Sequence, residues 1–357
     1  MANEDSIPAS SAPGIAVVTG AAGFVGGHLC ERLVSAGYQV VASDLRDPKL
    51  PGTRFSSCDI TDAAACRKLA EGADVIFHVA SMVQTRRSGA ASVWAVNLGG
   101  TRNLLAAARE AGVRRFVYVS SASVVYQGRD IENGDESLPY AAESQAPYAD
   151  SKGVAEREVL AASGKAGLLT SSLRPHIIYG PGDGRFLPAI LRRAQAGALR
   201  VGIGTHDKLS DFTYIDNLID ALLLADRKLV EEPALGGRAY FITNGEPIPF
   251  WGFVDRVLAA IGQPALKGRV PFGIAYAAAA CAEAVNAILG RSANRRLERG
   301  DDRHHRDADA ERHDHERRPS RTPRRRSDGE PRREAMPRNQ RAPDPSEHRA
   351  HHRGEPR

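Results

Sequence analysis

Short apolar runs rich in valine and isoleucine alternate with longer segments of helical periodicity over residues 15–266. This alternation predicts a parallel sheet covered by helices, because each apolar strand must be buried between layers. The expected strands are Ile15–Thr19, Gln39–Ser43, Val75–Val79, Arg115–Ser120 and Leu168–Leu173. The expected helices are Val25–Ala36, Ala63–Glu71, Asn97–Ala111, Ala149–Ala162 and Leu187–Gln195. The sequence therefore predicts an α/β, doubly wound fold of the Rossmann type.

The same pattern divides the chain into four parts. We expect a flexible N-terminus over residues 1–13 and a Rossmann domain over residues 14–180. Glycine and proline then punctuate the chain at 180–183, which predicts a smaller substrate-binding lobe over 181–290, interleaved with the sheet. The apolar run from Phe272 to Leu289 is interrupted by Glu283 and Asn286. Because such polar residues are costly in a bilayer centre, we expect a packed helix there rather than a membrane span.

Residues 291–357 differ in composition from the rest of the chain. They hold 20 arginines, no lysine, 14 acidic residues and seven histidines, and their only large apolar side chains are Leu297 and Met336. Such a segment cannot bury a core, so we expect it to be disordered. All of its lysine and arginine positions are arginine, which is the composition expected when GC-rich codons are translated out of frame. We therefore predict a frameshifted tail, and a genuine disordered polyampholyte is the alternative.

Charge and cysteine content exclude several classes of protein. The formal net charge is +5, but the tail carries all of the basic excess, so a nucleic-acid-binding body is not expected. No CxxC spacing joins the four cysteines, which argues against a zinc site or a disulfide framework. The start of the chain lacks the basic and apolar regions of a signal peptide. We expect a cytoplasmic protein without a metal.

The strongest local motif is the GxxGxxG of residues 20–26, which follows a strand and opens a helix. Gly20 permits a tight turn, Gly23 lets the backbone approach a pyrophosphate, and Gly26 allows close helix packing. The first helical N–H groups, near Phe24 and Val25, then face the phosphates. The motif predicts a dinucleotide cofactor.

Other strand ends complete the expected cofactor site. Asp44 ends the second strand, where a carboxylate accepts ribose hydroxyls and repels a 2′-phosphate, so we expect NAD. Arg46 could pair with that phosphate, which leaves NADP as the alternative. The residues expected beside the adenine and along the cofactor channel are Asp59, Ile60, Val79, Ala80 and Ser81. Asp59 could instead be a helix cap or loop carboxylate.

The candidate catalytic residues are Ser121, Tyr148 and Lys152. Tyr148 and Lys152 are four residues apart, on one face of the expected helix, and an ammonium lowers the pKa of a neighbouring tyrosine. Lys152 would also hold the nicotinamide ribose. A strand end presents Ser121 toward the same cleft, with Ser123 as the second choice. The alternative is that these hydroxyls only satisfy backbone groups.

The chain resembles extended short-chain dehydrogenases/reductases, and among them the 3β-hydroxysteroid dehydrogenase family, over about residues 15–290. The segments that carry the resemblance are 116–140, which precede the YxxxK, together with Asn97-Leu98-Gly99-Gly100-Thr101, residues 174–183 and residues 211–217. Those ahead of the YxxxK are similar to sterol-4α-carboxylate 3-dehydrogenases. The resemblance implies a Ser121, Tyr148 and Lys152 triad, with Pro175, Ile177 and Ile178 beside the nicotinamide.

The resemblance implies an NAD(P)-dependent oxidoreductase acting on the CH–OH group of a 3β-hydroxysteroid or 4-carboxysterol, with oxidation to the 3-ketone. The alternatives are a 2-alkyl-3-oxoalkanoate reductase, a nucleotide-sugar epimerase or dehydratase, and a non-catalytic NAD(P)-sensing protein. The expected partner is a small hydrophobic alcohol or ketone. Peripheral membrane contact and a homodimer through the helices Asn97–Ala111 and Ala149–Ala162 are further expectations.

Overall fold

The computed structural model of the chain describes residues 13–84, 89–144, 146–204, 208–278 and 280–281. The elements below all belong to one compact unit, Met1–Ala280. The predictions for the N-terminal segment up to residue 12 and for the tail, residues 291–357, lie outside the described residues.

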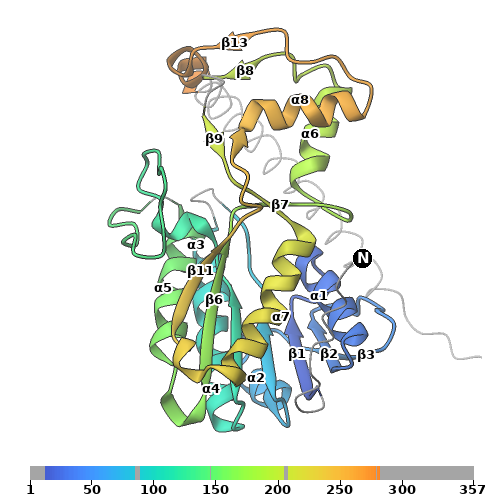
Figure 1. Cartoon of the computed structure of the whole chain (residues 1–357), viewed down its shortest axis with the longest axis vertical. Helices are drawn as coiled ribbons and strands as arrows, with labels where there is room; N and C mark the ends of the chain where they lie inside the picture. The colour runs from blue at the N-terminus through green and yellow to red at the C-terminus, as the bar shows by residue number, and fades with distance from the viewer. Residues whose placement is uncertain (1–12, 85–88, 145, 205–207, 279, 282–357) are drawn as a thin grey trace, which may run out of the picture. The chain divides into compact units, whose positions relative to one another are not determined.

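A seven-stranded, all-parallel sheet forms the centre of this unit (Figure 1). Its strand order is β11-β6-β5-β4-β1-β2-β3, so the order reverses between β1 and β4. The strands are β1 (Ile15–Thr19), β2 (Gln39–Asp44), β3 (Thr53–Ser57), β4 (Val75–His78), β5 (Arg115–Val119), β6 (Leu169–Pro175) and β11 (Arg238–Ile242). This confirms the predicted doubly wound fold, in which ligands bind where the strand order reverses.

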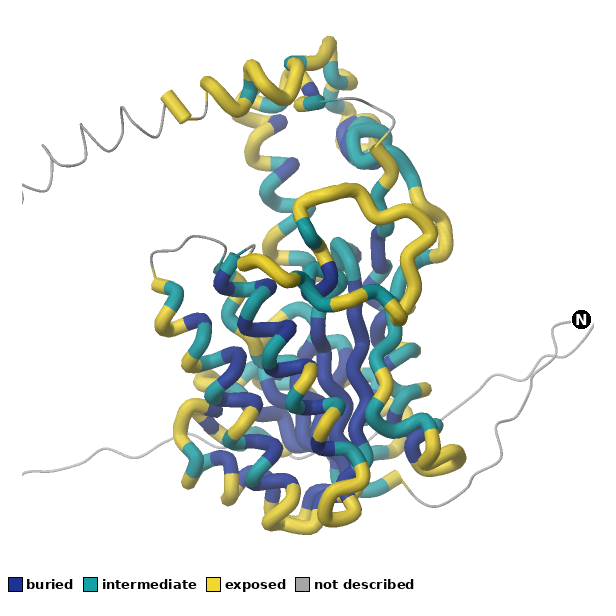
Figure 2. Tube along the Cα trace, turned by 90° about the vertical axis from the view of Figure 1, so that its left-hand side faces the viewer, coloured by how far each residue is buried: buried dark blue, intermediate teal, exposed yellow. Residues whose placement is uncertain are grey.

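Helices cover both faces of the sheet, and side chains alternate between two cores. One core joins the sheet to α2 (Ala63–Ala70), α4 (Thr101–Glu110) and α5 (Pro147–Ala161). The other joins it to α1 (Phe24–Ser35) and α7 (Ile215–Glu231). Because successive strand residues point to opposite faces, both faces of the central strands are buried, as the dark tube segments in Figure 2 show. Short turns lie at η2 (Ala122–Val125), η3 (Lys165–Gly167) and η4 (Pro233–Leu235).

The sequence pattern located five of the seven strands to within about two residues of their ends, and it missed β3 and β11. It was also wrong about a single helix over Asn97–Ala111. The structure has α3 (Ala90–Trp94), a π-helical turn η1 (Ala95–Gly100) and then α4. Buried Asn97 lies in this wider turn. Its side-chain amide accepts from Met82 N–H, and it donates to Met82 O and, at 3.0 Å, to Ser151 Oγ.

A smaller set of elements sits beyond the carboxyl edge of the sheet, at the top of Figure 1. It contains α6 (Phe186–Gln195), α8 (Phe250–Ala260) and the short strands β7 (Ile177–Tyr179), β8 (Gly202–Ile203), β9 (Leu209–Ser210), β10 (Phe212–Tyr214), β12 (Ile248–Pro249) and β13 (Arg269–Val270). Aromatic rings hold it together, with Phe212 stacked on Phe253 at 4.2 Å between centroids. Between these elements the chain returns to the sheet through α7 and β11.

The upper elements leave several large apolar side chains exposed, namely Leu209, Phe272, Ile274 and Tyr276. Residues 272–278 are helical, and the rest of the expected helix up to Leu289 lies outside the described residues apart from 280–281. Among the residues that are described, no helix is both long and apolar enough to cross a bilayer.

A buried ion pair fastens α7 to the sheet. Arg115 on β5 pairs with Asp226 on α7, and Tyr38 Oη donates a 2.7 Å hydrogen bond to the same carboxylate. The side chain of Asp226 is only 2% exposed. Removing one partner of such a pair leaves an uncompensated buried charge.

We expect Asp226→Ala to lower the free energy of unfolding by about 3–5 kcal/mol, because it strands the Arg115 guanidinium. Glu158→Ala is the matched control, since it breaks the exposed pair of Glu158 with Arg102 and should cost about 1 kcal/mol or less. Urea unfolding of both variants measures the difference. Equal losses of unfolding free energy in the two variants would contradict a larger contribution from the buried pair.

Candidate active site

A cleft of about 890 Å³ opens at the carboxyl edge of the sheet, where the strand order reverses between β1 and β4. Its size suits a bound organic ligand. Most of the predicted cofactor residues line it, namely Gly20, Gly23, Phe24, Val25, Gly26, Asp44, Asp59, Ile60, Val79, Ala80, Ser81, Pro175, Ile177 and Ile178. Ser121 and Tyr148 line it as well, whereas Arg46 and Lys152 do not.

The glycines of the motif allow neighbouring backbone segments to approach more closely than a side chain would permit. Gly20 has φ +72°, and a Cβ there would lie 2.8 Å from the Ala80 backbone. A Cβ on Gly26 would lie 2.1 Å from the Gly20 carbonyl oxygen. No side chain caps the first turn of α1, which begins after Gly23. The free N–H groups of that turn therefore fit the phosphates of a dinucleotide.

Two carboxylates, Asp44 and Asp59, line the cleft. Asp44 accepts hydrogen bonds from Ala22 N–H at 3.0 Å and Leu45 N–H at 2.7 Å, which ties the glycine loop to the end of β2. Asp59 is exposed and accepts from the backbone and hydroxyl of Thr61, and these bonds hold its pKa below the usual range. Part of the Asp59 carboxylate is thus committed to its own loop.

His78 organises the floor of this cleft, although sequence reasoning did not select it. Thr101 Oγ1 donates to Asn97 O at 2.6 Å, so it accepts from His78 Nε2–H at 2.9 Å. Thr19 Oγ1 then donates to the unprotonated His78 Nδ1 at 2.8 Å and accepts from Val79 N–H and Ala80 N–H. This chain of bonds assigns one neutral tautomer. It joins β1 and β4 to η1 and α4 next to Gly20.

Burial also favours the neutral form of the His78 ring. The His78 side chain has no exposed surface, and burial lowers its pKa to about 3, with the nearby Lys152 charge acting in the same direction. The ring is therefore neutral at ordinary pH. A polar residue inside the apolar run of β4 was the only signal of this role that the sequence offered.

Ser121 and Tyr148 both line the cleft. Burial raises the pKa of Tyr148, while the neighbouring Ser121 hydroxyl and the positive charge of Arg185 act to lower it. Ser123 contacts Ser121 Oγ at 2.9 Å and does not line the cleft. Tyr148 is at the start of α5, where Pro147 occupies the first helical position.

Lys152 lies one turn further along α5 and beneath the cleft, only 1% exposed. Its Nζ donates to Val119 O at 2.5 Å and sits 4.0 Å from the centroid of the Tyr118 ring. Burial lowers the pKa of Lys152 to about 7, and the Glu156 charge opposes that shift. The cation–π contact and the carbonyl replace part of the lost hydration.

Glu156 and Arg174 form a second buried unit that sequence reasoning left without a role. Arg174 forms hydrogen bonds to both Glu156 oxygens, at 2.7–3.2 Å, and Ser172 and Tyr140 donate to the same carboxylate. Burial acts to raise the pKa of Glu156, but the bonds from Arg174 bring it below its usual range. This pair joins α5 to the end of β6, directly before Pro175.

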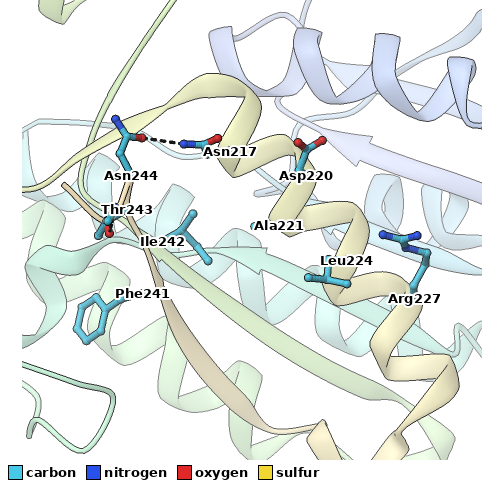
Figure 3. A pocket seen from close by; sticks show the side chains of 10 residues that line it. Asn217, Asp220, Ala221, Leu224, Arg227, Phe241, Ile242, Thr243 and Asn244 are labelled. Atoms are coloured by element: carbon cyan, nitrogen blue, oxygen red, sulfur yellow. Dashed lines mark hydrogen bonds between the residues drawn. The ribbon is translucent and has the colours of Figure 1, made fainter. Parts of the chain in front are cut away.

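A second hollow, of about 540 Å³, lies between α7 and the end of β11 (Figure 3). Asn217, Asp220, Leu224, Arg227 and Asn244 line it, and Asn217 donates to Asn244 Oδ1 at 2.9 Å. It shares no lining residue with the first cleft. None of the candidate catalytic or cofactor-binding residues lines this second hollow.

Comparisons with known proteins agree with this geometry. Residues 17–271 match the model of the 3-beta hydroxysteroid dehydrogenase/isomerase family. Sterol-4-alpha-carboxylate 3-dehydrogenase, decarboxylating, of Mus musculus is 37% identical over 261 residues, which cover 72% of each chain. The 3 beta-hydroxysteroid dehydrogenase/Delta 5-->4-isomerase of Mycobacterium tuberculosis is 41% identical over 269 residues, again 72% of each chain. The 2-alkyl-3-oxoalkanoate reductase of Stenotrophomonas maltophilia is 38% identical over 285 residues, 76% of this chain and 83% of that one.

Among solved structures, a double mutant of the dTDP-glucose 4,6-dehydratase DesIV from Streptomyces venezuelae, with NAD bound, superimposes with a TM-score of 0.60. It is 26% identical, and the match covers 72% of this chain and 84% of that one. The likeness supports binding of an NAD-type dinucleotide in the cleft.

Because unfolded His78 binds a proton below pH 6.5 and the native ring does not until about pH 3, stability should fall as the pH falls through this window. The limiting slope is about 1.4 kcal/mol per pH unit. His78→Gln removes this dependence, so the difference in unfolding free energy between the wild type and the variant should shrink steadily between pH 6 and pH 4. Urea titrations at several pH values measure it. A pH-independent difference would contradict a buried, neutral ring.

Proposed function

Because the chain belongs to the 3-beta hydroxysteroid dehydrogenase/isomerase family, we propose that it oxidises the carbinol of a 3β-hydroxysteroid or 4-carboxysterol to the 3-ketone, with NAD. The observation that carries the proposal is that Ser121 and Tyr148 line the same cleft as the glycine loop. The names of the relatives support an alcohol dehydrogenase of this kind.

In this proposal Tyr148 takes the hydroxyl proton and Ser121 holds the substrate oxygen. The nicotinamide ring, when bound, accepts the hydride. Lys152 follows Tyr148 by one turn of α5, and in this proposal its ammonium stabilises the developing phenolate. If the substrate bears a 4-carboxylate, its oxidation gives a β-keto acid, which loses CO₂ readily because the ketone accepts the electron pair.

A 2-alkyl-3-oxoalkanoate reductase is the second candidate activity, since the Stenotrophomonas relative bears that name. A sensor that binds NAD without chemistry is the rival of another class. Nicotinamide reduction assayed with hydroxysteroids, 4-carboxysterols, 3-hydroxy acids and nucleotide sugars separates these activities. Tight NAD binding with no turnover of any of these substrates would favour the sensor.

Tyr148→Phe should lower kcat by about 100-fold or more while NAD affinity stays within a few-fold, because only the proton acceptor is lost. The matched control is Tyr126→Phe, which removes an exposed phenol that does not line the cleft. Steady-state kinetics and calorimetric NAD titration measure the two effects. Near-normal turnover of Tyr148→Phe would refute the assignment.

We also propose NAD rather than NADP, on the charge of Asp44 at the end of β2. Asp44→Ser should raise the ratio of kcat/KM for NADP over NAD by about tenfold or more, because it removes the charge that opposes a 2′-phosphate. Asp59→Asn is the control, since Asp59 lines the same cleft and should leave the ratio unchanged. A wild-type preference for NADP would mean that Arg46 decides the choice.

The expectations of a homodimer and of peripheral membrane contact stay predictions. The homodimer would use the outer faces of α4 and α5, where the exposed pair of Arg102 and Glu158 joins the two helices. The exposed apolar side chains at Leu209, Phe272 and Ile274 are compatible with membrane contact. Light scattering that shows a monomer at micromolar concentration would contradict the prediction of a dimer. Failure of the protein to sediment with lipid vesicles would contradict the prediction of membrane contact.

A further inference from the structure

The cleft is nearly without cations around the candidate catalytic tyrosine. Among the described residues that line it, Arg185 is the one lysine or arginine, and aliphatic side chains such as Val83, Ile177 and Ile178 line the same cleft. Neither a neutral alcohol nor a steroid ring system has any use for a guanidinium at this position. The arginine therefore points to an anionic group on the ligand.

Arg185 directly precedes α6, at the end of a turn that packs against α1. Asp183, two residues earlier, is not its partner. The Asp183 carboxylate accepts 2.7–3.1 Å hydrogen bonds from the backbone N–H groups of Arg185, Phe186 and Leu187, and so caps α6. The exposed Arg185 side chain makes no hydrogen bond or ion pair with any residue in the described part of the chain. Its five donors are available to a ligand.

The charge of Arg185 reaches the reacting end of the cleft. It acts on the Tyr148 hydroxyl in the direction that lowers the Tyr148 pKa, against the effect of burial. Arg185 also lines the same cleft as Tyr148 and Ser121, so one ligand can present an anion to Arg185 and a carbinol to Tyr148 and Ser121. This placement favours a substrate whose negative charge is near its reacting carbon.

We propose that Arg185 binds a carboxylate carried by the carbon next to the carbinol carbon, so that the preferred substrates are 3-hydroxy acids. The proposal rests on the function proposed above and selects among its substrates, since 4-carboxysterols and 3-hydroxyalkanoates are such acids and simple 3β-hydroxysteroids are not. A guanidinium fork matches the two oxygens of a carboxylate, and a charge-assisted pair of this kind changes affinity by about 10- to 100-fold. Arg185 adds no chemical step, because it holds the acid while hydride and proton leave the carbinol.

The cofactor offers a competing anion. The turn that carries Arg185 also approaches α1, since a Cβ on Gly182 would lie 3.3 Å from the His28 ring. A guanidinium on this turn could therefore contact the cofactor pyrophosphate instead. The two anions have different experimental consequences, because the pyrophosphate is present with every substrate and the carboxylate is not.

The test compares Arg185→Gln and Arg185→Lys with the wild type on matched pairs of substrates. One pair is a 3β-hydroxysteroid with and without a 4-carboxylate, and the other is a 3-hydroxyalkanoic acid and its methyl ester. Arg185→Gln should lower the preference in kcat/KM for the acid by about 10- to 100-fold, mostly through KM, and Arg185→Lys should restore part of it. NAD affinity by calorimetry should stay unchanged. Arg192→Gln, an exposed arginine on α6 outside the cleft, is the control.

Equal losses for the acid and its neutral partner, together with weaker NAD binding, would overturn the proposal in favour of the pyrophosphate. Wild-type turnover of a neutral 3β-hydroxysteroid without any preference for the acid would overturn it while leaving the proposed function intact. If no alcohol is turned over, the proposed function fails. Calorimetric titration of the acid and the ester into the NAD-loaded protein then still decides whether Arg185 recognises a carboxylate.

Discussion

The cost of removing a lysine ammonium from water is the constraint around which this cleft is organised. Lys152 is almost fully buried, and burial alone drives its side chain toward the neutral form. The Val119 carbonyl, the face of Tyr118 and the charge of Glu156 each restore part of the lost stabilisation. Two of these groups are supplied by β5 and the third by α5 itself. The charge of the buried lysine is therefore stabilised only while α5 and β5 are held together.

Two buried polar units provide that hold. The pair of Glu156 and Arg174 links α5 to β6 and continues directly into Pro175 at the cleft wall. His78 links β4 to β1 and η1 on the other side, and its neutrality avoids a second cation near Lys152. The pair of Glu156 and Arg174 contributes little net stability, since burying charge costs about as much as pairing returns. The value of both units is that they fix the relative positions of the glycine loop, α5 and the strand ends.

The sequence was most informative where burial imposes a pattern. Apolar runs located β1, β2, β4, β5 and β6, and the glycine motif located the cofactor cleft, because both follow from local geometry. β3 was missed because its residues, Thr53–Ser57, are mostly polar and partly exposed. β11 was missed although Ala239–Ile242 is apolar, because this edge strand lies after the point where the regular alternation of strands and helices loosens. The π-helical turn depends on contacts of Asn97 with residues distant in sequence. The roles of His78, Glu156 and Arg185 likewise depend on residues distant in sequence, so no local sequence pattern predicts them.

The directed hydrogen bonds of His78 also make this residue a natural spectroscopic label. A ring locked in one tautomer gives two nitrogen resonances with distinct and fixed chemical shifts, and its Nε2 proton is shielded from exchange with solvent. Thr19 Oγ1 also accepts hydrogen bonds from Val79 N–H and Ala80 N–H, which are part of the cleft wall. A rearrangement of these residues would therefore change the chemical shifts of the His78 ring. Nuclear magnetic resonance of a single imidazole can thus follow ligand entry without a foreign probe.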